Sequence, residues 1–156
     1  MSTIFNDDFR EFIQALNANN VDYILVGGYA VILHGYRRVT GDLDIWVNRT
    51  KENYSKLVKA FSQFGLPVFD MTEEKFLDVE TVDVFSFGRP PVSIDIITKL
   101  SGVEFDEAFP RALHFDENGL MIRFIHLNNL IEAKKAAGRF KDLDDIEKLS
   151  SATDLG

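Results

Sequence analysis

The spacing of apolar residues divides the chain into stretches with helical periodicity and stretches with strand periodicity. Residues 7–19 predict an amphipathic helix, because their large apolar side chains recur at intervals of three and four. These side chains are Phe9, Phe12, Ile13 and Leu16. Residues 51–64 have the same spacing and predict a second helix. A short helix is expected at 105–112, and two more, separated near Gly138, are expected at 126–150.

Short runs of apolar and β-branched residues predict strands between these helices. The runs cover residues 21–26, 42–47, 82–87, 92–97 and 120–125. Helices and strands alternate at first, and strands dominate the middle of the chain before the final helices. This order predicts an α/β (α+β) fold, in which helices pack on a mixed β-sheet. Because no repeat or long linker interrupts the pattern, we expect one domain over residues 1–150 and a flexible tail at 151–156.

Composition and charge narrow the classes of function. The chain has 156 residues, a net charge of -8 and no cysteine, which excludes disulfides, thiolate zinc sites and cysteine nucleophiles. The charge also argues against strong nonspecific binding of nucleic acid, whereas a small anion bound together with a divalent cation is compatible with it. The N-terminus shows no secretory signal, and no apolar stretch approaches the roughly 20 residues that span a bilayer. We therefore expect a cytoplasmic protein without membrane contact.

Three acidic residues occupy positions that apolar packing does not explain. Asp42 and Asp44 are two residues apart in a predicted strand, so both side chains point to one face of it. Leu43 and Ile45 point to the opposite face, toward a core. Asp95 is enclosed by apolar neighbours in the sequence SIDII, where an isolated charge is costly unless it has a partner. If the two strands are neighbours in the sheet, the three carboxylates form one cluster.

Such a cluster has two interpretations. Carboxylates that repel one another are tolerated when they face open water or when a cation lies between them. Oxygen ligands suit a hard cation such as Mg²⁺ or Mn²⁺, and three carboxylates can hold two such ions for phosphoryl displacement. In the structural alternative, Asp42 merely begins a strand after a turn, Asp44 is solvated, and Asp95 pairs with an arginine.

A glycine pair upstream favours the catalytic interpretation. Gly27 and Gly28 follow a predicted strand and precede a short helical pattern. There the amides of Gly27, Gly28 and Tyr29 can point at an anion, and glycine lets the backbone approach a phosphate closely. A glycine pair alone would be a weak signal. Its combination with an Asp-x-Asp pair and a third acid on a later strand is far more specific.

The basic residues near these motifs are harder to assign. Arg38 lies just before the acidic pair, where it could neutralise phosphate charge or pair with one of the acids. Lys134, Arg139 and Lys141 could line the far side of a cleft. The acids that follow them, Asp142, Asp144 and Asp145, favour a solvated helical face for most of these residues.

Together these motifs resemble the nucleotidyltransferase superfamily related to DNA polymerase β. The family pattern is an apolar strand, a Gly-Gly or Gly-Ser turn, a short helix, an Asp-x-Asp pair and a third acid on a neighbouring strand. Here it is VGGYAVILHGYRRVTGDLDIWV, with 13 residues between Gly28 and Asp42, followed later by SIDII. The chain is most similar to small bacterial members of the abortive-infection and antibiotic-modifying types. The likeness covers residues 21–100, and more weakly the C-terminal helices at 126–150.

The resemblance implies a nucleotidyltransferase-like domain with a role for each site residue. Asp42, Asp44 and Asp95 would bind the metal ions, and Asp95 would also help to activate an acceptor hydroxyl. Gly27 and Gly28 would hold the triphosphate of an NTP. The chain has Gly28 where many active members carry a serine whose hydroxyl contacts phosphate, so only backbone amides are available at that position.

Two classes of function follow. The first is a metal-dependent nucleotidyltransferase that moves a nucleoside monophosphate from an NTP to a hydroxyl of a small molecule, a protein or RNA. The second is a non-catalytic or weakly active nucleotide-binding regulatory protein, such as a toxin–antitoxin component. The three acids favour catalysis, whereas Gly28 and the short chain favour the second class. Labelled product formed from Mg²⁺ and a labelled NTP would distinguish them.

Overall fold

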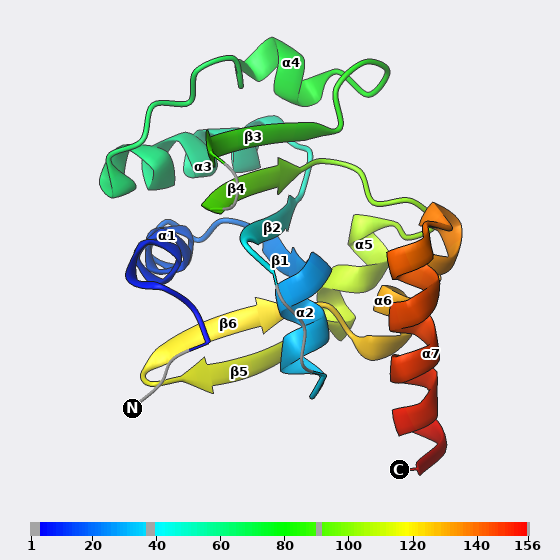
Figure 1. Ribbon diagram of the computed structural model, residues 1–156. Coiled ribbons are helices and arrows are strands. Elements are labelled where there is room, and N and C mark those ends of the chain that lie inside the picture. Colours follow the sequence, from blue (N-terminus) through cyan, green and yellow to red (C-terminus); the bar gives the residue numbers. More distant parts are fainter. Residues whose placement is uncertain (1–3, 37–39, 90–91, 156) are drawn as a thin grey trace.

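The computed structural model describes residues 4–36, 40–89 and 92–155, which form a six-stranded sheet between two groups of helices (Figure 1). The strands are β1 (Tyr23–Val26), β2 (Asp42–Val47), β3 (Val84–Arg89), β4 (Val92–Ile97), β5 (Leu113–Glu117) and β6 (Leu120–Phe124). Their order across the sheet is β3-β4-β2-β1-β6-β5. Pairing is parallel between β2 and β4 and between β1 and β6, and antiparallel elsewhere. The predicted mixed sheet with flanking helices is confirmed.

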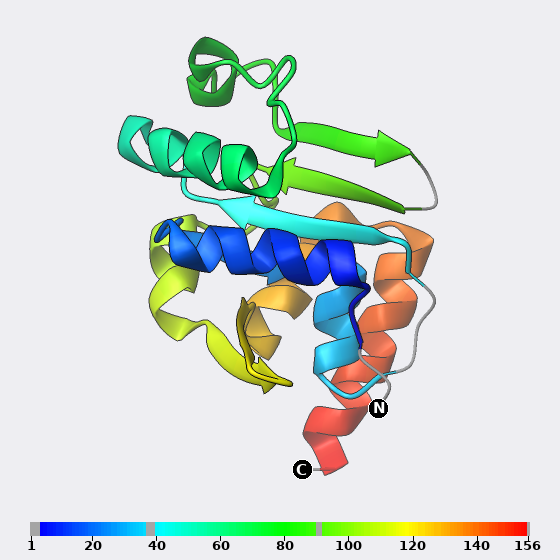
Figure 2. The same cartoon turned by 90° about the vertical axis from the view of Figure 1, so that its left-hand side faces the viewer.

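Helices cover both faces of this sheet. On one face α1 (Asp7–Ala18) and α3 (Lys51–Phe64) pack side by side (Figure 2), and α4 (Glu73–Leu77) packs next to α3. The other face carries α2 (Gly27–Leu33), α5 (Phe105–Ala108), the short 3-10 turn η1 (Phe109–Arg111), α6 (Leu127–Ala137) and α7 (Phe140–Leu155). The side chains of alternate residues of β2 point to the two opposite faces of the sheet. Leu43 and Ile45 are buried in the core under α1 and α3, whereas Trp46 is buried in the core on the other side.

Local sequence signals set where α1 and α3 begin and end. The side chain of Asn6 caps α1 by accepting a hydrogen bond from the Phe9 amide at 2.8 Å. The Thr50 hydroxyl caps α3 in the same way, accepting from the Asn53 amide at 3.1 Å. Gly65 ends α3 in a left-handed conformation with φ 91°. The apolar spacing predicts both helices to within a residue of their observed bounds. The caps are the local reason why the helices begin and end there.

The hairpin of β5 and β6 is the main departure from the predicted elements. The apolar pattern predicts the β6 strand but not β5. Four of the five β5 residues are exposed because β5 is an edge strand, so this strand has no alternating apolar face. Asn118 and Gly119 join the two strands with φ of 51° and 89°. An Asn-Gly pair between two candidate strands is a strong hairpin signal, and it marks β5 in the sequence.

The C-terminal segment forms the two helices that its periodicity predicts. Gly138, with φ 66°, ends α6 and separates it from α7. Helix α7 continues to Leu155, so the backbone of residues 151–155 is helical, and the flexibility of the 151–156 segment stays a prediction. Within the described part of the chain, no helix is long and apolar enough to cross a membrane.

Candidate active site

The three acids singled out in the sequence lie on neighbouring strands, on the sheet face that carries α2, α6 and α7. Parallel pairing of β2 with β4 places Asp44 directly opposite Asp95, and places Asp42 opposite Ser93. Asp42, Asp44 and Asp95 all line an open cavity of about 540 Å³. The two strands that carry the three carboxylates are therefore neighbours, which is the condition for these acids to form one cluster.

The electrostatics of this cluster centre on Asp44. Burial is the largest cause of a rise in the pKa of Asp44 to about 7, followed by the charge of Asp95 and a side-chain hydrogen bond with it. The charge of Asp42 raises the pKa of Asp44 further, and the charge of Lys141 opposes the rise. Asp42 itself accepts a hydrogen bond from Ser93 Oγ at 2.6 Å through its Oδ1. Asp44 and Asp95 are therefore a close pair of acids, with Asp42 held beside them.

The raised pKa predicts how the stability of the metal-free protein depends on pH. The Asp44 carboxyl ionises near pH 3.8 in the unfolded chain but only near pH 7 in the folded chain. Folding therefore takes up a proton between these values, so this carboxyl lowers the free energy of unfolding as pH rises, by at most about 4 kcal/mol. Urea unfolding across this pH window in EDTA measures the loss. Asp44→Asn is the matched control, and an equal pH dependence in both proteins would contradict the prediction.

The donor chemistry of the cluster suits a hard divalent cation. Carboxylate oxygens are the ligands that Mg²⁺ and Mn²⁺ prefer, and Asp44 and Asp95 already lie within hydrogen-bonding distance of each other. Among the residues that the structure describes, no group of three or more acidic, histidine or cysteine side chains is arranged to hold a metal ion. The Asp42 carboxylate is hydrogen-bonded to Ser93 instead. A cation held by all three acids would use the second oxygen of Asp42, because the first is bonded to Ser93.

The two glycines are packed closely against residues of this cavity. Gly27 has φ 71°, and a Cβ at this position would overlap Oδ2 of Asp44. A Cβ at Gly28 would lie 2.6 Å from Thr40 Oγ1. The absent side chains therefore make room for Asp44 and Thr40, which both line the cavity. The Thr40 hydroxyl occupies the space that a serine side chain would need at position 28, which gives a structural reason for the glycine there.

Tyr29 and Arg38 are the other two residues that the sequence assigns to nucleotide binding. The Tyr29 side chain is buried, and its ring stacks on Phe5 with centroids 4.7 Å apart. Burial, followed by the charge of Asp42, raises the pKa of the Tyr29 hydroxyl. The ring belongs to the core, and Tyr29 is not among the described residues that line the cavity. Arg38 lies outside the described residues.

Solved structures match this architecture, although no protein-family model and no curated protein sequence matches the chain. A candidate nucleotidyltransferase from Thermotoga maritima has a TM-score of 0.60 at 14% identity, covering 92% of this chain and 91% of that one. The lincosamide antibiotic adenylyltransferase LnuA, solved with lincomycin, has a TM-score of 0.59 at 16% identity, with 96% and 99% covered. ANT(2")-Ia, solved with adenylyl-2"-tobramycin, has a TM-score of 0.58 at 17% identity, with 95% and 87% covered.

The fold is that of the nucleotidyltransferases. The resemblance seen in the glycine turn and the acidic motifs is therefore confirmed at the level of the fold. The motifs occupy only α2, β2 and β4, whereas the matches extend over 92% to 96% of the chain. The likeness therefore extends well beyond the elements that carry the motifs.

In this nucleotidyltransferase fold, α6, α7 and the turn between them place basic side chains on the same cavity as the acids. Lys134, Arg139 and Lys141 all line it. Lys134 is only 6% exposed, and its Nζ lies 2.9 Å from Asp145 and 3.5 Å from Asp142. Arg139 Nε lies 2.6 Å from Asp142. The solvated helical face favoured by the sequence is wrong for Lys134, Asp142 and Asp145, which are buried together because their opposite charges pair.

Burial and pairing act in opposite directions on the pKa of Asp142. Burial alone raises the pKa of Asp142, but hydrogen bonds and charge from Arg139 and the charge of Lys134 outweigh it, so the pKa is lowered overall. Asp142 is therefore an ionised partner that fixes both cations beside the cavity. A signal for this arrangement exists in the sequence, because Gly138 breaks the helix between Lys134 and Asp142 and lets the two halves pack against each other.

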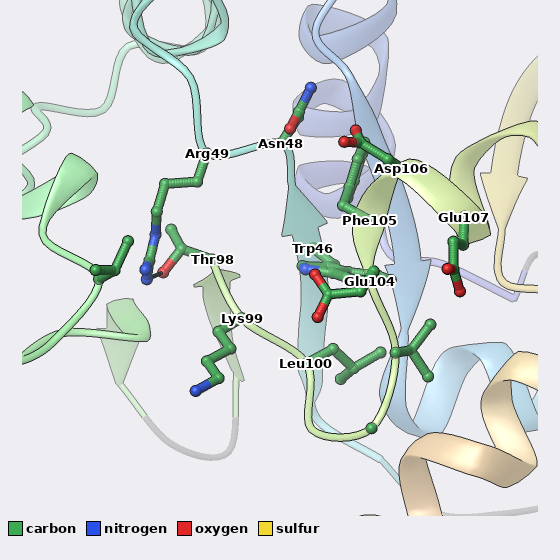
Figure 3. A pocket seen from close by; sticks show the side chains of 13 residues that line it. Trp46, Asn48, Arg49, Thr98, Lys99, Leu100, Glu104, Phe105, Asp106 and Glu107 are labelled. Atoms are coloured by element: carbon green, nitrogen blue, oxygen red, sulfur yellow. Dashed lines mark hydrogen bonds between the residues drawn. The ribbon is translucent and has the colours of Figure 1, made fainter.

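A second cavity has a volume of about 640 Å³ (Figure 3) and shares two lining residues with the first. Lys99 and Leu100, which follow β4, line both cavities. Trp46 lies at its wall, but it is buried and packs edge-on against Phe105 with ring centroids 5.1 Å apart. Trp46 is therefore a packing residue rather than a surface on which a flat ring could stack.

Proposed function

We propose that this protein is a nucleotidyltransferase, which transfers a nucleoside monophosphate from an NTP to an acceptor hydroxyl with Mg²⁺ or Mn²⁺ bound at Asp42, Asp44 and Asp95. The observation that carries the proposal is a single cavity lined by these acids on the sheet and by three basic residues from α6, α7 and the turn between them. Opposite charges on two walls suit a triphosphate bound together with a divalent cation. The shared fold of the structural neighbours supports the same class of reaction.

Charge complementarity assigns a task to each wall of the cavity. A triphosphate is repelled by the three acids, so a divalent cation between them would supply the neutralising charge. Lys141 is exposed and available to pair with phosphate oxygens from the other wall, whereas Lys134 and Arg139 line that wall while paired with Asp142. The amides of the Gly27-Gly28 turn would contact the phosphates beside the acids. Phosphoryl transfer depends mainly on such positioning and charge stabilisation.

The acid pair also supplies a proton acceptor. In the proposed reaction the acceptor oxygen bonds to the α-phosphorus, the bond to the bridging oxygen breaks, and pyrophosphate leaves. The hydroxyl proton passes to the Asp44–Asp95 pair. A carboxylate beside the acceptor hydroxyl can take up this proton as a general base.

A small-molecule acceptor is the best supported. The second cavity, of about 640 Å³, adjoins the acid cavity through Lys99 and Leu100 and falls in the size range of small-molecule sites. Two structural neighbours were solved with small molecules, lincomycin and adenylyl-2"-tobramycin. The net charge of -8 disfavours a bulky polyanion such as RNA. Transfer of label to protein or RNA rather than to a small molecule would overturn this part of the proposal.

Isothermal titration calorimetry tests the donor site without knowledge of the acceptor. We expect the four common NTPs to bind only when Mg²⁺ or Mn²⁺ is present, because the acids repel the uncompensated triphosphate. NTP binding that is equally tight in EDTA would contradict the metal-bridged site. Charge-reversed Lys141→Glu, at an exposed residue of the same cavity, is expected to weaken nucleotide binding, and circular dichroism would show whether that variant is still folded.

One observation favours the second candidate, a nucleotide-binding regulatory protein such as a toxin–antitoxin component. Within the described residues, the three carboxylates do not converge as a closed metal site. Release of pyrophosphate from an NTP in the presence of Mn²⁺ and a panel of hydroxyl-bearing small molecules separates the two functions. Binding without release would support the regulatory protein, and release would support the transferase.

A further inference from the structure

Two cross-strand pairs join β2 to β4 at the acid cluster, and they differ in character. Asp44 lies opposite Asp95, so this pair brings two acids together. Asp42 lies opposite Ser93, whose Oγ donates a hydrogen bond to Asp42 Oδ1 at 2.6 Å. The first pair repels when both members are ionised, whereas the second is attractive.

The surroundings of the two partners show what this bond does. Ser93 is only 8% exposed, so its hydroxyl is held in place by the strands around it. Asp42 is the first residue of β2 and is exposed, so packing does not select the orientation of its carboxylate. Among the described residues, Ser93 is the hydrogen-bond partner of this carboxylate, and Oδ2 is left uncommitted. A single bond therefore sets the orientation of Asp42 relative to Asp44 and Asp95.

We infer that Ser93 is a positioning residue for the proposed nucleotidyl transfer, holding one oxygen of Asp42 so that the other is presented to a cation beside Asp44 and Asp95. The inference rests on the proposed function, because it requires a cation at these acids. Carboxylates that bind metals are commonly hydrogen-bonded by a second layer of residues, and loss of such a partner costs about 10–100-fold in metal affinity or activity. A serine on a strand whose other residues are mostly Ile and Val is also left unexplained by apolar packing.

Binding of Mn²⁺ to the nucleotide-free protein, followed by electron paramagnetic resonance of the free ion, tests this role without any turnover. Ser93→Ala is expected to weaken Mn²⁺ binding by about tenfold, because Asp42 loses its fixed orientation. Ser93→Thr keeps a hydroxyl on the same strand and is expected to bind Mn²⁺ almost as tightly as the wild type. A merely structural serine would change the melting temperature but not the Mn²⁺ affinity.

Thr98→Val is the matched control for loss of a buried hydroxyl. Thr98 follows β4 directly, is 7% exposed, and bonds with Arg49 and the Val82 carbonyl rather than with the acids. This variant should lose stability and keep its Mn²⁺ affinity. Wild-type protein that fails to bind Mn²⁺ would reject the metal site of the proposed function. Mn²⁺ binding by Ser93→Ala that equals or exceeds wild type, or a loss shared with Thr98→Val, would overturn the role of Ser93 alone.

Discussion

Replacing Asp44 with asparagine is expected to stabilise the metal-free protein and to abolish its response to divalent cations. Asparagine keeps the shape of the side chain but removes the charge that repels Asp95 and Asp42 at alkaline pH. Relief of this kind is worth about 0.5–2 kcal/mol, and each kcal/mol corresponds to roughly 2–4 °C in Tm for a domain of this size. Nucleotidyl transfer should fall by about three orders of magnitude, because losing a metal ligand costs several kcal/mol of transition-state stabilisation.

Differential scanning fluorimetry with EDTA and with Mn²⁺ measures both stability effects, and Asp83→Asn is the matched control. Asp83 lies just before β3 and pairs with Arg49 at 3.1 Å, and it lines neither of the two cavities. Its replacement should leave the Mn²⁺-dependent rise in Tm unchanged, since stabilisation by a ligand follows affinity for the folded state. An Asp44→Asn protein that is less stable in EDTA and still responds to Mn²⁺ would place Asp44 outside a metal site.

The acid cluster shows which features of the site strand periodicity can predict and which it cannot. A period of two places Asp42 and Asp44 on one face whatever lies around the strand, and an acid inside an apolar run marks Asp95 as costly. The pairing of β2 with β4 is different, because α3, α4 and β3 separate these strands in the sequence. The sequence pattern predicts only that the three carboxylates would cluster if these two strands were neighbours. The register that brings Asp44 opposite Asp95 comes from the fold.

The basic residues on the cavity wall opposite the acids show why the rest of the site could not be predicted from the sequence. Periodicity describes which face of a helix is apolar, but it does not tell whether charges on that face are solvated or paired with each other. Lys134 and Asp142 lie on different helices, and their pairing depends on how α6 packs against α7. The sequence pattern also suggests that Gly27 is open to a ligand. Its contact with Asp44, a residue on another strand, is a property of the tertiary structure.

That contact predicts that Gly27→Ala both destabilises the protein and disables the acid cluster. A φ of 71° costs a residue other than glycine about 1–2 kcal/mol. The new Cβ would also overlap Oδ2 of Asp44, which adds an overpacking penalty of about 1–3 kcal/mol. The free energy of unfolding, measured in urea, should therefore fall by about 2–5 kcal/mol. Binding of Mn²⁺ and of NTP should be lost, because Asp44 must move away from Asp95.

Gly35→Ala separates the two causes of this effect. Gly35 has φ 100°, but no described atom lies within 4 Å of the position that its Cβ would take. This variant should show backbone strain alone and should keep Mn²⁺ and nucleotide binding. The double variant Gly27→Ala/Asp44→Ala removes the overlap with the carboxylate, leaving a close contact with the Cβ of residue 44 at 2.9 Å, and keeps the strain, so the two substitutions should be coupled by about 1–3 kcal/mol. Equal losses at positions 27 and 35, or strictly additive effects at 27 and 44, would show that the close approach of Gly27 to Asp44 does not govern the site.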